Sequence, residues 1–294
     1  MFGKRRFDAM SPDRMPLMSD GTGSQLDFYS RFAPCLVCVE SRGRDGELSL
    51  GTAFHIGDGC LVTARHVIES RELVSLTPYE SSAEISLESV DVIYPSDETA
   101  DIALLRTDFS LDSYMTSNII LGNGPVNNKV DHIEIGGHLD DWINNSLVLM
   151  EVIVMGYPPI PTSPEPVLVA TRGEVNAIID PYVGSKHPLF VLSPMARGGF
   201  SGGPALTASG FLLGVITSSL LTNHAAPELG YGVALTVEPL WNLLLENNIY
   251  PGSGNRQLMG ELFGLPDNLP EPIRRPKSPK PARFSEGCFD NPPF

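Results

Sequence analysis

The sequence predicts an all-β protein built as a sandwich or a barrel. Short apolar runs separated by turn residues recur between about residues 26 and 251, and an Asp58-Gly59 pair joins two of them. A single clear helical pattern is visible, from Pro239 to Glu246. Many short strands with few helices are typical of β-sandwiches and β-barrels.

The expected strands follow in chain order. The segment APCLVCVES, which contains Cys35 and Cys38, is the first. ELSLGTAFHIG and CLVTA then form a hairpin, because Asp-Gly supplies the positive φ angles that its turn needs. Six further strands are expected at Ile102–Leu105, Val148–Met155, Val167–Ala170, Leu189–Leu192, Phe211–Ile216 and Tyr231–Leu235.

The two ends of the chain differ in composition from its centre. Residues 1–25 are rich in Met, Pro, Ser, Asp and Gly and lack periodicity, which predicts a disordered arm. Proline recurs every few residues near the C-terminus, so a disordered Pro-rich tail is expected over residues 252–294. Recruitment of a partner protein by this tail remains open as an alternative.

Charge and cysteine content exclude several classes of protein. The net charge of −15 argues against a nucleic-acid-binding protein, which would need a basic surface. No apolar stretch approaches the roughly 18 residues of a membrane span, and no secretory leader is recognisable. The pair Cys35-x-x-Cys38 is interpreted as buried core thiols, since positions three apart on a strand face opposite ways. No metal or other cofactor is expected, and a reducing, cytoplasmic location is favoured.

The stretch GGFSGGP, residues 198–204, holds a serine in an unusually bare backbone. It satisfies G-x-S-x-G, the nucleophile elbow of α/β-hydrolases, so an esterase of that type is one alternative. That fold places its acid and its histidine after the serine. Here only His224 follows, the later aspartates Asp267 and Asp290 lie in the tail, and Pro204 opposes the required helix. The chain order therefore disfavours the esterase.

The order His, Asp, Ser on an all-β chain suits a different hydrolase. His66 follows an expected strand in LVTARHV, Asp101 begins an apolar run in DIALLR, and Ser201 lies in GGFSGGPAL. These segments resemble the three catalytic blocks of the trypsin/chymotrypsin-like serine peptidases, and above all the disulfide-poor, HtrA-like branch. The resemblance covers about Leu36 to Ile249.

The resemblance implies two six-stranded antiparallel β-barrels of chymotrypsin-like type with the active site between them. The first barrel, residues 26–117, would carry His66 and Asp101. The second, residues 118–251, would carry Ser201 and a short C-terminal helix. A serine endopeptidase acting on a protein or peptide substrate through an acyl-enzyme is implied. A catalytically silent fold used as a binding or scaffold module is the alternative.

The resemblance also implies a role for each site residue. His66 would be the base, Asp101 its orienting partner and Ser201 the nucleophile, with an oxyanion hole formed by the backbone N–H groups of Gly199 and Ser201. The residues implied for the specificity pocket are Met195, Thr217, Ser218 and Gly232. They favour a small or medium apolar side chain before the cleaved bond, while His224 is the alternative pocket residue for acidic or amide side chains.

Two departures from the secreted relatives are visible. Phe200 stands where those relatives carry an aspartate that receives a newly cut N-terminus. Activity is therefore not expected to depend on N-terminal cleavage through that ion pair. Cys60 has no matching cysteine near His66, so the disulfide that brackets the histidine in those relatives is absent.

Overall fold

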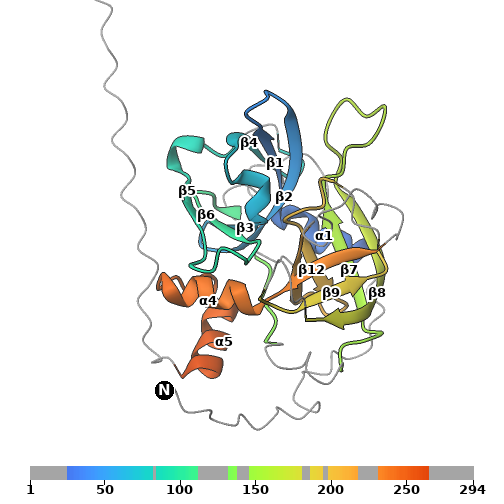
Figure 1. Ribbon diagram of the computed structural model, residues 1–294, viewed down its shortest axis with the longest axis vertical. Helices are drawn as coiled ribbons and strands as arrows, with labels where there is room; N and C mark the ends of the chain where they lie inside the picture. The colour runs from blue at the N-terminus through green and yellow to red at the C-terminus, as the bar shows by residue number, and fades with distance from the viewer. Residues whose placement is uncertain are drawn as a thin grey trace, which may run out of the picture.

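The computed structural model describes residues 25–81, 84–111, 132–137, 146–180, 186–194, 198–217 and 231–264. Two β units lie side by side in it, with few helices (Figure 1). The predicted all-β, chymotrypsin-like class is confirmed, with one difference in the first unit. The second unit is a closed six-stranded barrel, whereas the first is a six-stranded sheet whose edge strands do not pair with each other.

The first unit is an antiparallel sheet with the strand order β4-β1-β2-β3-β6-β5. The strand β5 has only three residues, so little of it is available to pair with β4. Instead, the segment between the two strands returns to β4, where the Ile85 N–H donates to the Leu76 carbonyl at 2.9 Å. The strands of this unit are β1 (Leu36–Arg42), β2 (Leu48–Gly57), β3 (Cys60–Thr63), β4 (Glu72–Pro78), β5 (Asp91–Ile93) and β6 (Ala103–Arg106).

The hairpin predicted between β2 and β3 is confirmed. Asp58 has φ 50° and Gly59 has φ 74°, the left-handed conformations expected of an Asp-Gly turn. A side chain at Gly59 would also lie 2.4 Å from the Thr107 carbonyl oxygen. This turn sets the register of β3, whose C-terminal end leads into the short helix α2 (Arg65–Ile68).

The second unit is a closed antiparallel barrel with the order β10-β11-β12-β9-β8-β7. Its interior holds an apolar cluster that includes Val154, Phe190, Phe200 and Leu213. The strands of this unit are β7 (Glu151–Gly156), β8 (Val169–Ile179), β9 (Leu189–Leu192), β10 (Pro204–Thr207), β11 (Leu212–Ile216) and β12 (Gly232–Thr236).

Helices pack against both units. The predicted C-terminal helix is present as α4 (Glu238–Glu246), which buries Leu240, Trp241, Leu243 and Leu244. A helix α1 (Gln25–Phe32) precedes β1 and touches both units. Its Phe32 ring leaves no room for a side chain at Gly210 in the second unit, and Tyr29 meets Tyr79 of the first unit edge to face at 6.1 Å. None of the described helices is long and apolar enough to cross a membrane.

The start of the expected disordered tail was wrong, because residues 253–263 form a helix, α5 (Ser253–Phe263). The proline pattern begins only after this helix, and the buried side chain of Asn255 anchors it. The Asn255 Oδ1 accepts the Ile135 N–H at 2.7 Å, and its Nδ2 donates to the Ile56 carbonyl at 2.9 Å. Residues 1–24 and 265–294, and the expected unit boundary at 117/118, lie outside the described residues.

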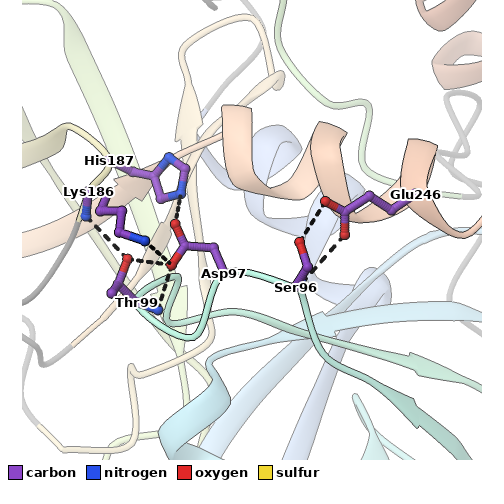
Figure 2. Close-up of polar contacts among 6 residues, drawn as sticks. All are labelled: Ser96, Asp97, Thr99, Lys186, His187 and Glu246. Carbon is purple, nitrogen blue, oxygen red and sulfur yellow. Dashed lines mark hydrogen bonds and ion pairs between the residues drawn. The ribbon is translucent and has the colours of Figure 1, made fainter.

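The loop before Asp101 joins the first unit to the second (Figure 2). Asp97 lies 3.5 Å from Lys186 Nζ and 3.4 Å from His187 Nε2, both just before β9. The Ser96 hydroxyl donates to Glu246 of α4 at 2.8 Å. These contacts fix the approach of the chain to Asp101.

Candidate active site

His66 lies in the first turn of α2, directly after β3. Its backbone N–H donates to Asp101 Oδ1 at 3.0 Å, and its ring Nδ1 lies 2.8 Å from Asp101 Oδ2. An ionised carboxylate can only accept, so Nδ1 carries the proton of this bond. In the neutral ring the lone pair is then on Nε2, which is the arrangement a general base needs.

Asp101 comes just before β6, with its side chain 15% exposed. Besides His66, it accepts a short hydrogen bond from the hydroxyl of Thr217, which follows β11 in the second unit. Burial alone would raise the pKa of the Asp101 carboxyl. This effect of burial is outweighed by the hydrogen bond and charge of His66, by the Thr217 hydroxyl and by the His66 N–H. The pKa of Asp101 therefore lies below its ordinary value.

Ser201 lies in a tight turn between β9 and β10 and is 8% exposed. The turn is held by backbone bonds, in which the Gly202 N–H donates to the Ile216 carbonyl and the Gly203 N–H to the Phe200 carbonyl, both at 2.8 Å. Gly202 has φ +84°, and a side chain there would lie 2.2 Å from the Thr52 carbonyl oxygen. Only glycine fits this conformation and this close approach.

Two routes connect the Ser201 turn to the His66–Asp101 pair. A side chain at Gly202 would lie 2.7 Å from the backbone nitrogen of Ala64, two residues before His66. By the second route, the hydroxyl of Thr217 reaches Asp101, and its neighbour Ile216 holds the Gly202 N–H. The structure thus puts His66 and Asp101 in direct contact and packs the serine turn against the ends of the elements that carry them.

The expected specificity pocket falls mostly outside the described residues, which do not include Met195, Ser218 or His224. Thr217 is buried, and its hydroxyl is turned to Asp101. Gly232 begins β12 opposite Leu192 of β9. The pocket and its preference for small or medium apolar side chains therefore stay predictions.

The aromatic side chain at position 200 has a structural role. Phe200 is buried in the core of the second barrel, and Gly156 of β7 leaves space for its ring. The position that receives a new N-terminus in the secreted relatives is thus filled by an apolar side chain here.

The three cysteines in the described part of the chain, Cys35, Cys38 and Cys60, are buried thiols. Cys35 lies in a 3-10 turn before β1 and not on the strand, so the opposite-face argument was wrong although both Cys35 and Cys38 are in the core. Burial raises the pKa of Cys38 and of Cys60 to about 12, which keeps both protonated and unreactive. Among the described residues no three metal-ligating side chains come together.

Sequence reasoning missed Thr52 of β2. Its backbone N–H donates to the Ser201 carbonyl at 2.9 Å, and its hydroxyl donates to the Gly199 carbonyl at 2.6 Å. Threonine is common in strands, and these contacts cross between units far apart in sequence. Nothing in the segment GTAF distinguishes this threonine from a structural one.

Comparison with known proteins agrees with this architecture. Residues 51–215, more than half of the chain, match the family described as the trypsin-like peptidase domain. The crystal structure of the Rv3671c protease from M. tuberculosis in its active form superposes with a TM-score of 0.53 at 17% identity, over 78% of this chain and 87% of that one. No curated protein matches the sequence.

HtrA-type proteases share the fold as well. A variant of the HtrA-type protease AlgW with a tripeptide gives a TM-score of 0.54 at 18% identity, over 76% of this chain and 63% of that one. AlgW itself with a tripeptide gives 0.50 at 19% identity, over 72% and 59%. The chain thus spans less than two thirds of the AlgW chains. Together with the family match, the shared fold shows that the chain belongs to the trypsin-like peptidase domain family, as a serine endopeptidase of HtrA-like fold.

Proposed function

We propose that this chain hydrolyses peptide bonds with a catalytic triad of His66, Asp101 and Ser201 through an acyl-enzyme. One observation supports this most strongly. The Asp101 carboxylate holds both the backbone N–H and the ring Nδ1 of His66, at 3.0 and 2.8 Å, beside the turn that carries Ser201. A hydroxyl is a weak nucleophile at neutral pH, and a base oriented in this way is what activates it.

In the acylation step, the Ser201 Oγ attacks the carbonyl carbon of the substrate while His66 Nε2 takes the hydroxyl proton. The carbon–nitrogen bond then breaks, and the leaving amine receives that proton from His66. A water molecule then attacks the carbonyl carbon of the ester and loses a proton to His66. The bond from that carbon to Ser201 Oγ breaks, His66 returns the proton to Oγ, and the acid is released. Asp101 keeps the ring in the correct tautomer and stabilises the imidazolium without itself becoming protonated.

The negative oxygen of the tetrahedral intermediate needs fixed donors. We assign this task to the backbone N–H groups of Gly199 and Ser201. Gly199 has φ +93°, a conformation that favours glycine, and a side chain there would lie 2.3 Å from the Tyr157 carbonyl oxygen. Removing one such donor costs about 2.7–4 kcal/mol of barrier in enzymes of this kind.

A fluorophosphonate probe tests the proposal, because it reacts with serines that a base has activated. We expect it to label the wild-type chain at Ser201 as a bond from Oγ to phosphorus forms and fluoride leaves. Labelling should be lost in both Ser201→Ala and His66→Ala. With a hydrolysable substrate, either change should lower turnover by roughly 10⁶-fold if the residues act as a unit.

A folded wild-type chain that takes no label would contradict the proposal and favour a silent fold used for binding. Label attached elsewhere than Ser201, or undiminished in His66→Ala, would contradict it equally. Circular dichroism of each variant shows whether the fold is retained.

A further inference from the structure

Thr52 crosses from the first unit to the turn that carries Ser201. It lies on β2, is completely buried, and uses both its backbone and its side chain in the second unit. Its N–H donates to the Ser201 carbonyl at 2.9 Å. Its Oγ1 lies 2.6 Å from the Gly199 carbonyl oxygen and 3.0 Å from the Tyr157 nitrogen. The two carbonyls on either side of Phe200 are therefore both held by one residue.

The direction of the hydroxyl bond follows from its partners. A threonine hydroxyl has one proton to donate, and the Tyr157 N–H is itself a donor. The Thr52 oxygen therefore accepts from Tyr157, and its proton is directed to the Gly199 carbonyl. The Tyr157 N–H also lies 3.3 Å from that carbonyl, so both donors converge on it.

These hydrogen bonds select one orientation of the Gly199–Phe200 peptide, which the glycine alone would leave free to rotate. Gly199 tolerates a wide range of backbone angles, and Gly198 before it is exposed with open space around it. If the Gly199 carbonyl turned away, the Thr52 hydroxyl would lose its acceptor at a site without access to water, and the Tyr157 N–H would keep only Thr52 Oγ1. Buried donors left without acceptors are costly, so the Gly199 carbonyl stays where it is.

We propose that Thr52 is a positioning residue for the oxyanion hole. The carbonyls that it fixes belong to the Gly199–Phe200 and Ser201–Gly202 peptides. Holding these two peptides restrains the Phe200–Ser201 peptide between them, which carries the Ser201 N–H. It also anchors the C-terminal side of Gly199, whose own N–H belongs to the preceding peptide. This inference rests on the proposed function for the identity of the hole. It adds that the first unit, which supplies the base, also sets the geometry of the donors in the second.

The test compares three variants of the whole chain. Thr52→Val keeps the shape and removes the hydroxyl, while Thr52→Ser keeps the hydroxyl. Thr207→Val is the matched control, because the buried Thr207 hydroxyl also accepts a backbone N–H, that of Phe211 at 3.2 Å. It lies on β10 and makes none of the contacts described for Thr52. Should Thr52→Val fail to fold, Thr52→Cys supplies a weaker donor of similar size.

Saturation kinetics with the fluorophosphonate probe separate binding from reaction. In Thr52→Val we expect the limiting rate of labelling to fall about 10- to 100-fold, short of the 10²–10³-fold loss caused by removing a donor outright. The probe concentration for half-saturation should stay unchanged. Thr52→Ser should have a limiting rate close to that of wild type. Thr207→Val should also keep the wild-type limiting rate, even if its melting temperature falls as far as that of Thr52→Val.

Hydrogen exchange over residues 198–203 gives a second readout that does not depend on reactivity. Exchange there should be faster in Thr52→Val than in wild type or Thr207→Val. A wild-type limiting rate in Thr52→Val, or a loss that merely follows the melting temperature in both valine variants, would overturn the inference. If the wild type takes no label, the proposed function fails, and unchanged exchange in Thr52→Val would then overturn the inference separately.

Discussion

At the scale of single residues, Asp101 is the group on which most of the candidate site depends. It accepts from the backbone and ring of His66 and from the Thr217 hydroxyl, so its donors come from both units. These contacts stabilise the ionised form, which is why its pKa lies below the ordinary value. A carboxylate held in this way selects the His66 tautomer with the proton on Nδ1.

We predict that Asp101→Asn lowers the rate of labelling, and of hydrolysis, by about 10⁴-fold while the chain stays folded. An asparagine amide turned toward His66 donates to Nδ1, which forces the ring proton onto Nε2 and removes the base. The second-order rate constant with the fluorophosphonate probe measures this. Thr217→Val, which keeps the carboxylate, should lose far less. A rate in Asp101→Asn within tenfold of wild type would show that Asp101 does not control the tautomer.

At the scale of elements, the strands that sequence predicted are those with continuous apolar runs. The β2–β3 hairpin was predicted from such runs and from the Asp58-Gly59 turn. The strand β8 extends nine residues beyond the predicted end at Ala170, because most of its residues are only partly buried and leave no apolar run. The strands β4, β5 and β10 were not predicted, since β5 and β10 are short and β4 mixes polar with apolar residues.

The residues of the candidate site also fall into two groups, those that the sequence predicted and those that it did not. His66, Asp101 and Ser201 were predicted because each lies in a local motif, and their order along the chain favours a peptidase over an esterase. Thr52 and the bond from Thr217 to Asp101 were not, because they are tertiary contacts of common strand residues. A local pattern indicates the candidate reacting groups, whereas the residues that hold them in place appear only when the two units are packed.

The helix α5 was also not predicted from the sequence, because it is anchored by tertiary contacts of Asn255. These contacts can be tested by their effect on stability. Asn255 is fully buried and bonds to the backbone at Ile135, Ile56 and Ile133. We predict that Asn255→Ala lowers the free energy of unfolding by about 2–4 kcal/mol, because it leaves these backbone groups without partners away from water. Denaturant titration measures the change.

Gln257 provides the control on the same helix. It is exposed and bonds only to Glu261 one turn away among the contacts described here. Gln257→Ala should therefore change the free energy of unfolding by no more than about 0.5 kcal/mol. Equal effects of the alanine changes at 255 and 257 would show that Asn255 does not anchor α5.

At the scale of the whole molecule, the candidate site lies where the two units meet. Thr52 of the first unit bonds to the serine turn, and Thr217 of the second unit bonds to Asp101. Asp97, in the loop before Asp101, contacts His187 of the second unit (Figure 2). No single unit holds a complete set of the proposed catalytic groups. The packing between the units therefore determines whether the proposed base, nucleophile and oxyanion donors have their working geometry.

Asp97, in the loop that contacts the second unit, makes the stability of the fold sensitive to acid. The backbone N–H and the hydroxyl of Thr99 lower the pKa of Asp97 from 3.8 to about 2, with smaller contributions from Lys186 and His187. A carboxyl whose pKa is lowered on folding stabilises the folded state above its ordinary pKa. That contribution is lost as the pH falls through the folded value. Asp97→Asn removes the charge but keeps an oxygen that can accept from Thr99.

We therefore predict that wild type is more stable than Asp97→Asn at pH 7 and that the difference shrinks between about pH 4 and pH 2. Urea midpoints measured across this range test it. Lys186→Gln should have little effect at any pH, because the Lys186 side chain is 72% exposed and solvent screens its pairing. A difference between wild type and Asp97→Asn that stays constant down to pH 2 would mean that the charge of Asp97 does not stabilise the folded chain. The junction would then depend on contacts such as the neutral hydrogen bonds of Thr52, which do not titrate.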